Sequence, residues 1–231
     1  MGERLLAGRR YFMLQDQQWV ECITCGLCTQ ENKYSIVEGR EEGVESFTVE
    51  EQSSFACRLC CAPFGRAFSS KISAGGRVIG ECKRDCQCTA VAPWLCMCRP
   101  EVKVFKDGRE IGTIVNPCFP LYNCKLELVV KTGDQILWTI SVYCLQYHVC
   151  CALPCGPCME MDINVEDEGK NPVGYLKKYF GGCLETYCTA ADRYEFTFPD
   201  ENDETKQALF LAALQFFDML FFEPKITFCG Q

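Results

Sequence analysis

Cysteine is the residue whose number and spacing in this sequence most clearly suggest chemistry. The chain has 231 residues, of which 21 are cysteine. A structural zinc site needs four tetrahedral ligands, usually supplied by two C-x2-C pairs. Half-sites are present, but no two stand at a familiar zinc-finger spacing, so zinc binding, redox chemistry and simple packing stay open. The main sets are Cys22, Cys25 and Cys28; Cys57, Cys60 and Cys61; Cys82, Cys86 and Cys88; Cys96 and Cys98; and Cys150, Cys151, Cys155 and Cys158.

Cys96 and Cys98 differ from the other sets because they lie in an apolar loop. They flank Met97 and directly follow Pro93-Trp94-Leu95. A thiol in such a loop is a suitable acceptor for a fatty thioester. One acyl chain binds a membrane only marginally, whereas two anchor a protein stably, so a pair of cysteines suits this role.

A run of acidic residues near the C-terminus could supply oxygen ligands to a calcium ion. It lacks the D-x-D-x-D-G order and the final glutamate of an EF-hand loop. The alternative is a solvated loop whose carboxylates favour the positive N-terminus of the helix that follows. The residues concerned are Asp192, Glu195, Asp200, Glu201, Asp203 and Glu204.

The sequence offers no set of catalytic residues. His148 is the single histidine, which excludes a site with two imidazoles, and it lies in an apolar run that is typical of core residues. A nucleophile elbow, a phosphate-binding loop and a Ser-His-Asp order are all missing from the sequence. We therefore predict that the protein is not an enzyme.

The charge balance argues against a nucleic-acid partner. The formal net charge is −8 at pH 7, whereas binding to a phosphate backbone depends on lysine and arginine. Residues 1–14 lack the apolar run of a secretory signal peptide. The expected compartment is therefore reducing, and disulfides are not expected.

Most of the chain shows the period-two alternation of short β-strands. Asp107-Gly108 and Thr132-Gly133-Asp134 lie between such runs and predict tight hairpin turns. Ten or more strands at this spacing indicate an antiparallel barrel or sandwich. The runs include 34–37, 47–49, 68–72, 102–105, 111–115, 126–130, 136–143, 161–165, 173–176 and 194–198.

Residues 205–222 have the composition of a helix that is apolar on nearly every side. Asp203 or Thr205 can cap it, and Pro224 ends it. Such a helix is either enclosed by protein or placed in lipid. Gln215 and Asp218 lie within it, and an ionised aspartate in hydrocarbon costs at least ~2.5 kcal/mol. The sequence therefore favours a helix inside a β-barrel over a membrane span.

Several segments together resemble the phospholipid scramblase family over residues 32–223. The segment most similar to the family is the C-terminal one, which contains Phe198-Pro199, Lys206-Gln207-Ala208 and the apolar helix ending at Glu223. The other matching segments are 32–36, 60–68, the G-x-x-I-G motif at 108–112, the strand around Asp162, and the cysteine-rich stretch ending at Cys98.

The resemblance implies a mainly β, tubby-like fold: a closed antiparallel barrel of about twelve strands around a central hydrophobic C-terminal helix. It divides the chain into an extension at 1–31, the barrel domain at 32–223 with its helix at about 205–222, and a tail at 224–231. It also implies calcium-activated, ATP-independent, bidirectional movement of phospholipids at the cytoplasmic face of the plasma membrane, by a palmitoylated protein. Some relatives are described as type II single-span proteins.

The resemblance implies a calcium site at Asp192, Glu201 and Asp203, and palmitate on Cys96, Cys98 and Cys88. The family's calcium segment is degraded here, because its first acid is Ala190, its Asn is Arg193 and its Gly is Glu195. We expect these changes to weaken calcium binding.

Two further hypotheses stay open from the sequence. The barrel could bind lipid headgroups or proteins without moving lipid, with Lys177 and Lys178 as a surface basic patch. A zinc-binding or redox protein is the other alternative.

Overall fold

Short alternating segments form the wall of the molecule in the computed structural model, which describes residues 8–16, 31–39, 44–54, 66–86, 100–117, 125–143, 160–179 and 193–222. Within these ranges the chain forms twelve strands and one helix. The strands are β1 (Tyr11–Gln15), β2 (Lys33–Glu38), β3 (Glu45–Gln52), β4 (Phe68–Ala74), β5 (Arg77–Arg84), β6 (Glu101–Lys106), β7 (Arg109–Val115), β8 (Lys125–Thr132), β9 (Gln135–Tyr143), β10 (Glu160–Glu166), β11 (Pro172–Tyr179) and β12 (Arg193–Phe196); the helix is α6 (Glu204–Phe221).

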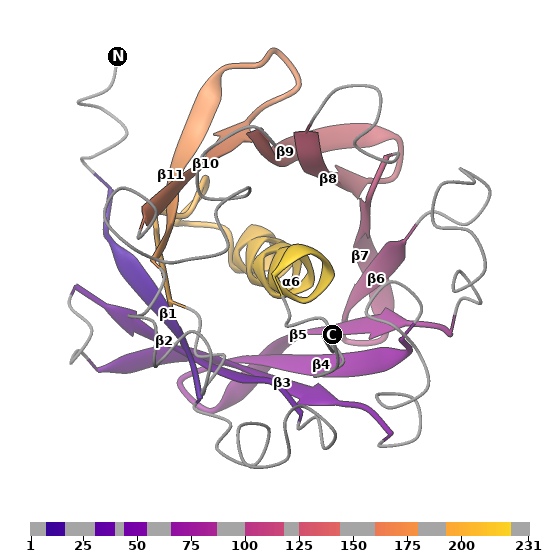
Figure 1. Ribbon diagram of the computed structural model, residues 1–231. Coiled ribbons are helices and arrows are strands. Elements are labelled where there is room, and N and C mark those ends of the chain that lie inside the picture. The colour runs from indigo at the N-terminus through magenta and orange to yellow at the C-terminus, as the bar shows by residue number, and fades with distance from the viewer. Residues whose placement is uncertain are drawn as a thin grey trace, which may run out of the picture.

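The strands close into an antiparallel barrel in which each strand pairs with its neighbours in the chain (Figure 1). The barrel closes where β1 pairs with β12, with Tyr11 opposite Phe196. This architecture confirms the predicted fold class. Because β1 lies within the segment expected to be an N-terminal extension, the barrel begins before residue 32.

The alternation of residue types determines which side chains face the lumen. In β10, Met161, Ile163 and Val165 are buried, whereas Glu160 and Asp162 are exposed. Successive strand residues point to opposite faces of a sheet, so the apolar set of each strand forms the inner surface. This is the period-two pattern on which the strand predictions depended.

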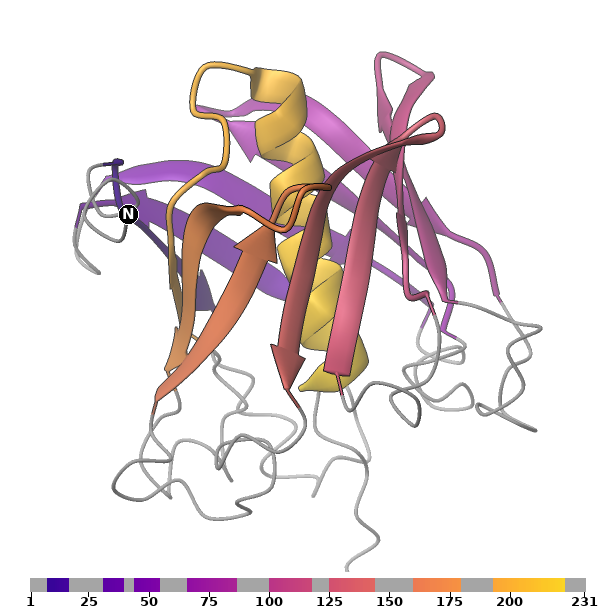
Figure 2. The same cartoon turned by 90° about the horizontal axis from the view of Figure 1, so that it is seen from above.

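Helix α6 runs through the lumen (Figure 2). Its residues from Ala208 to Leu220 are all buried. Asp203 caps the helix, since its side chain accepts hydrogen bonds from the backbone N–H groups of Thr205 and Lys206. The predicted bounds agree with the observed ones to within one residue, and the prediction that the barrel encloses the helix is confirmed.

Two glycines allow the wall to approach α6 closely. A Cβ atom on Gly112 would lie 2.5 Å from the carbonyl oxygen of Lys131 and 2.8 Å from Leu209 Cδ2. A Cβ on Gly80 would lie 2.9 Å from the Cβ of Ala208. The second glycine of the G-x-x-I-G motif is therefore required by packing.

Gly112→Ala is expected to lower the free energy of unfolding by about 1–3 kcal/mol, because the added methyl group overpacks a site bounded by backbone. Urea denaturation measures this change. Thr113→Ala, at the next and outward-facing position, is the control and should change stability by less than about 0.5 kcal/mol. Equal stability of the Gly112 variant and the wild type would contradict the close-packing argument.

Candidate functional site

The acidic residues before α6 already have protein partners. Glu201 Oε1 accepts a hydrogen bond from the backbone N–H of Arg9 at 2.7 Å. Asp203 is the N-cap of α6. Glu195 is buried in β12, where it accepts hydrogen bonds from Arg10 at 2.8 Å and from the Tyr179 hydroxyl at 2.6 Å. The structure thus uses these carboxylates to hold the N-terminal segment and the helix start.

The carboxylates of Asp200 and Glu204 are also engaged. Lys206 Nζ lies 2.8 Å from Asp200 Oδ2, and this hydrogen bond lowers the pKa of Asp200. Glu204 pairs with Lys106 Nζ at 2.7 Å and with Arg77, and the hydrogen bond from Lys106 is the main reason that the pKa of Glu204 is lowered. Two hairpins of the wall are therefore tied to the first turn of the helix.

Calcium binding at the predicted site stays a prediction. Asp192 lies outside the described residues, so the structure does not place it relative to Glu201 and Asp203. In the part of the chain that the structure describes, no three His, Cys, Asp or Glu side chains gather closely enough to hold a metal ion.

A buried ion pair joins α6 to the barrel wall near the end of the helix. Asp218 Oδ1 accepts hydrogen bonds from Lys178 Nζ at 3.2 Å and from the Tyr194 hydroxyl at 2.5 Å. Asp218 Oδ2 accepts from the Tyr34 hydroxyl at 2.7 Å. All four side chains are buried. One carboxylate therefore connects the helix with β2, β11 and β12.

The position of Lys178 corrects the hypothesis of a surface basic patch. Lys178 is 0% exposed, and its Nζ lies 4.6 Å from the ring centroid of Tyr194 and 4.3 Å from that of Phe222. Strand alternation turns Lys177 to the outer face, where it pairs with Glu160 at 2.9 Å. Two adjacent lysines thus have different roles, and only Lys177 lies on the surface.

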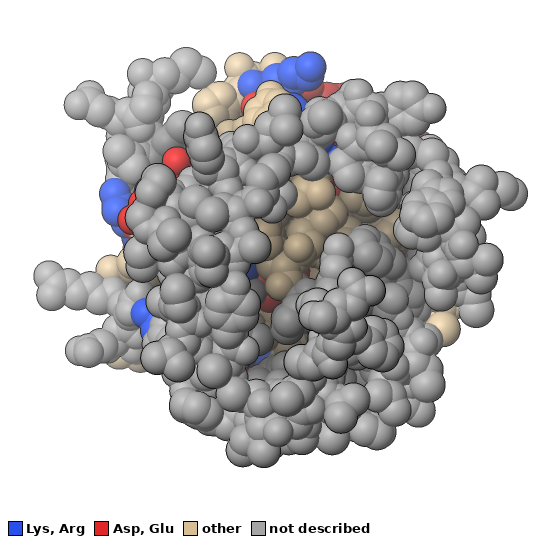
Figure 3. All heavy atoms as spheres, viewed as in Figure 1, with Lys and Arg blue, Asp and Glu red and all other residues tan. Residues whose placement is uncertain are grey.

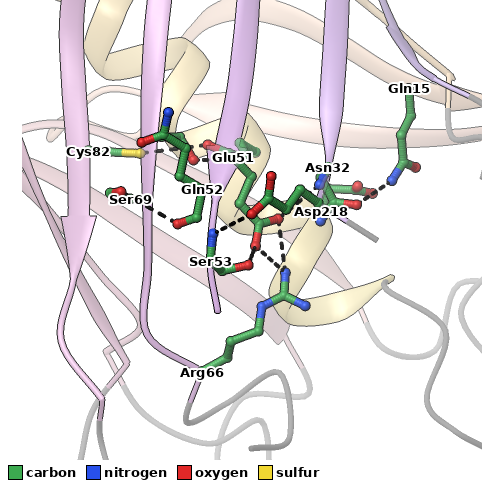
Figure 4. A network of polar contacts seen from close by, with 12 residues as sticks. Gln15, Asn32, Glu51, Gln52, Ser53, Arg66, Ser69, Cys82 and Asp218 are labelled. Carbon is green, nitrogen blue, oxygen red and sulfur yellow. Dashed lines mark hydrogen bonds and ion pairs between the residues drawn. The ribbon is translucent and has the colours of Figure 1, made fainter. Parts of the chain in front are cut away.

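Further polar side chains lie at the same end of the lumen (Figure 4). Gln215 of α6 donates a hydrogen bond to the Ser70 hydroxyl at 2.7 Å. Glu51 and Arg66 form a buried ion pair at 3.0 Å. The polar positions of the helix therefore meet polar partners on the wall, which removes the cost of burying them alone.

Two cysteines, Cys82 and Cys86, lie in the part of the chain that the structure describes, and they differ in exposure to solvent. Cys82 is buried beside Gln215, and burial raises the pKa of its thiol to about 12. Cys82 therefore packs as a neutral thiol at pH 7. Cys86 is exposed. The predicted acylation sites Cys88, Cys96 and Cys98 lie outside the described residues, as do most of the cysteines of the zinc and redox alternatives.

Alkylation should separate the two described thiols. In the native protein under reducing conditions, iodoacetamide is expected to modify Cys86 at least tenfold faster than Cys82, because the reactive thiolate is disfavoured at the buried site. Peptide mass spectrometry after timed quenching measures both rates, and denaturation with urea should make them similar. Equal native rates would contradict the burial of Cys82.

The barrel end at which α6 finishes contains apolar side chains as well as the buried charged ones described above. In the space-filling view onto this end, the described residues visible in the middle are mostly neither basic nor acidic (Figure 3). In the described ranges, no helix combines the length and apolar character that crossing a bilayer requires.

The comparisons with known proteins point to one family. A search of curated proteins found no match. The family model described as Scramblase matches residues 3–224, nearly the whole chain. That range contains the barrel, the enclosed helix, and the G-x-x-I-G and C-terminal motifs. The chain belongs to the Scramblase family.

Proposed function

We propose that this protein mediates ATP-independent, bidirectional movement of phospholipids between the leaflets of a membrane, at the cytoplasmic face of the plasma membrane. The match to the Scramblase family over residues 3–224 is the observation that carries the proposal. The closed barrel with its enclosed helix supports it, because this is the fold that the resemblance implies. Lipid transfer of this kind needs no catalytic residue.

Attachment to the membrane is assigned to palmitate on Cys88, Cys96 and Cys98. Two or more acyl chains hold a protein stably on a bilayer, whereas one does not. We expect the variant Cys96→Ser/Cys98→Ser to move from the membrane fraction to the soluble fraction of cells. Cys86→Ser removes an exposed thiol two residues before Cys88 in the sequence and serves as the control. This variant should stay in the membrane fraction.

Calcium is proposed as an activator that binds weakly at Asp192, Glu201 and Asp203. The degraded motif leaves fewer carboxylates than the family pattern, so a high calcium concentration is expected to be needed. Asp192→Asn is the appropriate variant, because changing Asp203 would also remove the cap of α6. A scrambling rate that is equal with calcium and with a chelator would remove calcium from the proposal.

Reconstitution into vesicles tests the transport activity itself. Fluorescent phospholipid is placed in both leaflets, and dithionite added outside bleaches the lipid that reaches the outer leaflet. The lipidated protein should convert the slow second phase of bleaching into a fast one, and heat-denatured protein serves as the control. Bleaching no faster than in empty vesicles would overturn the transport proposal.

One observation favours a second candidate, a membrane-associated module that binds lipid or protein without moving lipid. The buried residues of α6 face the barrel wall, so this helix offers little apolar surface along which a headgroup could cross. Flotation of the protein with vesicles, without faster bleaching in the same preparation, would select this candidate over scrambling.

A further inference from the structure

A pocket of about 330 Å³ opens beside the first turns of α6, at the end of the barrel opposite the Asp218 cluster. Three segments far apart in the sequence line it: the start of β9, the hairpin between β10 and β11, and the segment that leads into α6. Its apolar lining includes Ile136, Trp138 and Val173, and its acidic residues are Asp167, Glu168 and Asp200.

The lining of this pocket is negatively charged. Its three acidic residues face one basic residue, Lys206. The pKa of Asp167 is lowered, mainly by the hydrogen bond from the backbone N–H of Asn171, and the pKa of Asp200 is lowered by Lys206. Both groups are therefore ionised at neutral pH. An ionised carboxylate has about four acceptor positions, so it can accept from a ligand as well as from its neighbour.

A pocket lined by both apolar and acidic residues suits a hydrocarbon chain that ends in a cation. Lysine and arginine side chains have this form, since their stems cover apolar surface and their heads seek polar partners. A volume of this size also lies within the range of pockets that hold small ligands or side chains. Together, volume, lining and charge point to a basic side chain as the occupant.

We propose that this pocket binds a lysine or arginine side chain from a basic, partly apolar segment of a partner protein. The choice of a protein over a lipid headgroup rests on the proposed attachment through Cys88, Cys96 and Cys98. The chain leaves for these cysteines from the far end of β5, whose 8 residues span about 26 Å. Because β5 and β6 are antiparallel neighbours, Arg84 and Glu101 both lie at this end, and attachment through the proposed cysteines would turn the pocket, at the other end, away from the bilayer.

Peptide binding without vesicles tests this proposal independently of lipid transport. The probe is a short, blocked, fluorescent peptide of alternating leucine and arginine, and the matched probe has glutamine in place of arginine. Fluorescence anisotropy should show binding of the arginine peptide that weakens as salt is raised, and at least tenfold weaker binding of the glutamine peptide.

Variants of the protein locate the binding. Glu168→Lys reverses one exposed charge of the pocket and should weaken the arginine peptide about tenfold. Lys206→Gln removes the one basic residue among the described residues of the lining and should strengthen binding about threefold. Glu45→Lys makes the same charge change at the start of β3 and should alter binding by less than about twofold.

Two results would overturn the proposal. Equal affinity of Glu168→Lys and wild type for the arginine peptide would show that the pocket is not the binding site. The pocket would be assigned to an ammonium headgroup instead if two results occur together. The peptide does not bind, and Glu168→Lys is the one variant that no longer floats with phosphatidylcholine vesicles. Circular dichroism of each variant confirms that the barrel is folded.

Discussion

Asp218→Leu is expected to lower the free energy of unfolding by about 3–5 kcal/mol, because it leaves the ammonium of Lys178 buried without its carboxylate. The same change removes the acceptor of the Tyr34 and Tyr194 hydroxyls. Urea denaturation followed by circular dichroism measures the effect. This is one of the two largest losses of stability that we expect from a single side chain.

A double variant separates the ion pair from the space that it fills. Lys178→Met/Asp218→Leu replaces both charges by apolar groups of similar length, and its stability should lie within about 2 kcal/mol of the wild type. Lys177→Met, on the outer face of the same strand, should cost less than about 1 kcal/mol. A double variant as unstable as Asp218→Leu would show that charge burial is not the cause.

Phe210→Ala is expected to cost about 3–5 kcal/mol, because it empties the centre of an aromatic cluster between α6 and the wall. The ring centroid of Phe210 lies 6.0 Å from that of Trp138, 5.5 Å from Phe196 and 5.8 Å from Phe198. Its side chain is fully buried. Thermal unfolding gives the change in stability, and near-ultraviolet circular dichroism reports the loss of aromatic packing.

Phe12→Ala makes the same substitution on the outer face of β1 and serves as the control. Phe12 is partly exposed and lies between the buried residues Tyr11 and Met13. Its loss should cost less than about 1.5 kcal/mol. Similar losses of stability in Phe210→Ala and Phe12→Ala would mean that packing around Phe210 stabilises the protein no more than a partly exposed side chain does.

Much of the fold could be predicted because its elements have strong local patterns. The alternation of Met161, Ile163 and Val165 reveals a strand directly, and the composition of residues 205–222 reveals an enclosed helix. The strand β1 was missed because its five residues show no clear period. Its structure depends on pairing with β2 and β12, and the second of these partners is nearly the whole chain away.

The polar interior was only partly predictable. Asp218 in an apolar helix indicates a buried partner, but the sequence does not say which cation supplies it. Strand alternation requires Lys177 and Lys178 to face opposite sides, and the register of β11 decides which one is buried. The calcium and acylation predictions depend on residues such as Asp192 and Cys96, whose spacing alone does not fix a geometry.

The closure of β1 on β12, with α6 following every strand, has a consequence for biosynthesis. Lumen-facing residues made early, such as Ile36, Val49 and Ile72, have no helix to cover them until residue 222 has left the ribosome. Contacts between such distant segments form slowly. The nascent chain therefore carries the apolar residues of its early strands without their native cover until α6 is made, and a chain in that condition is prone to aggregate.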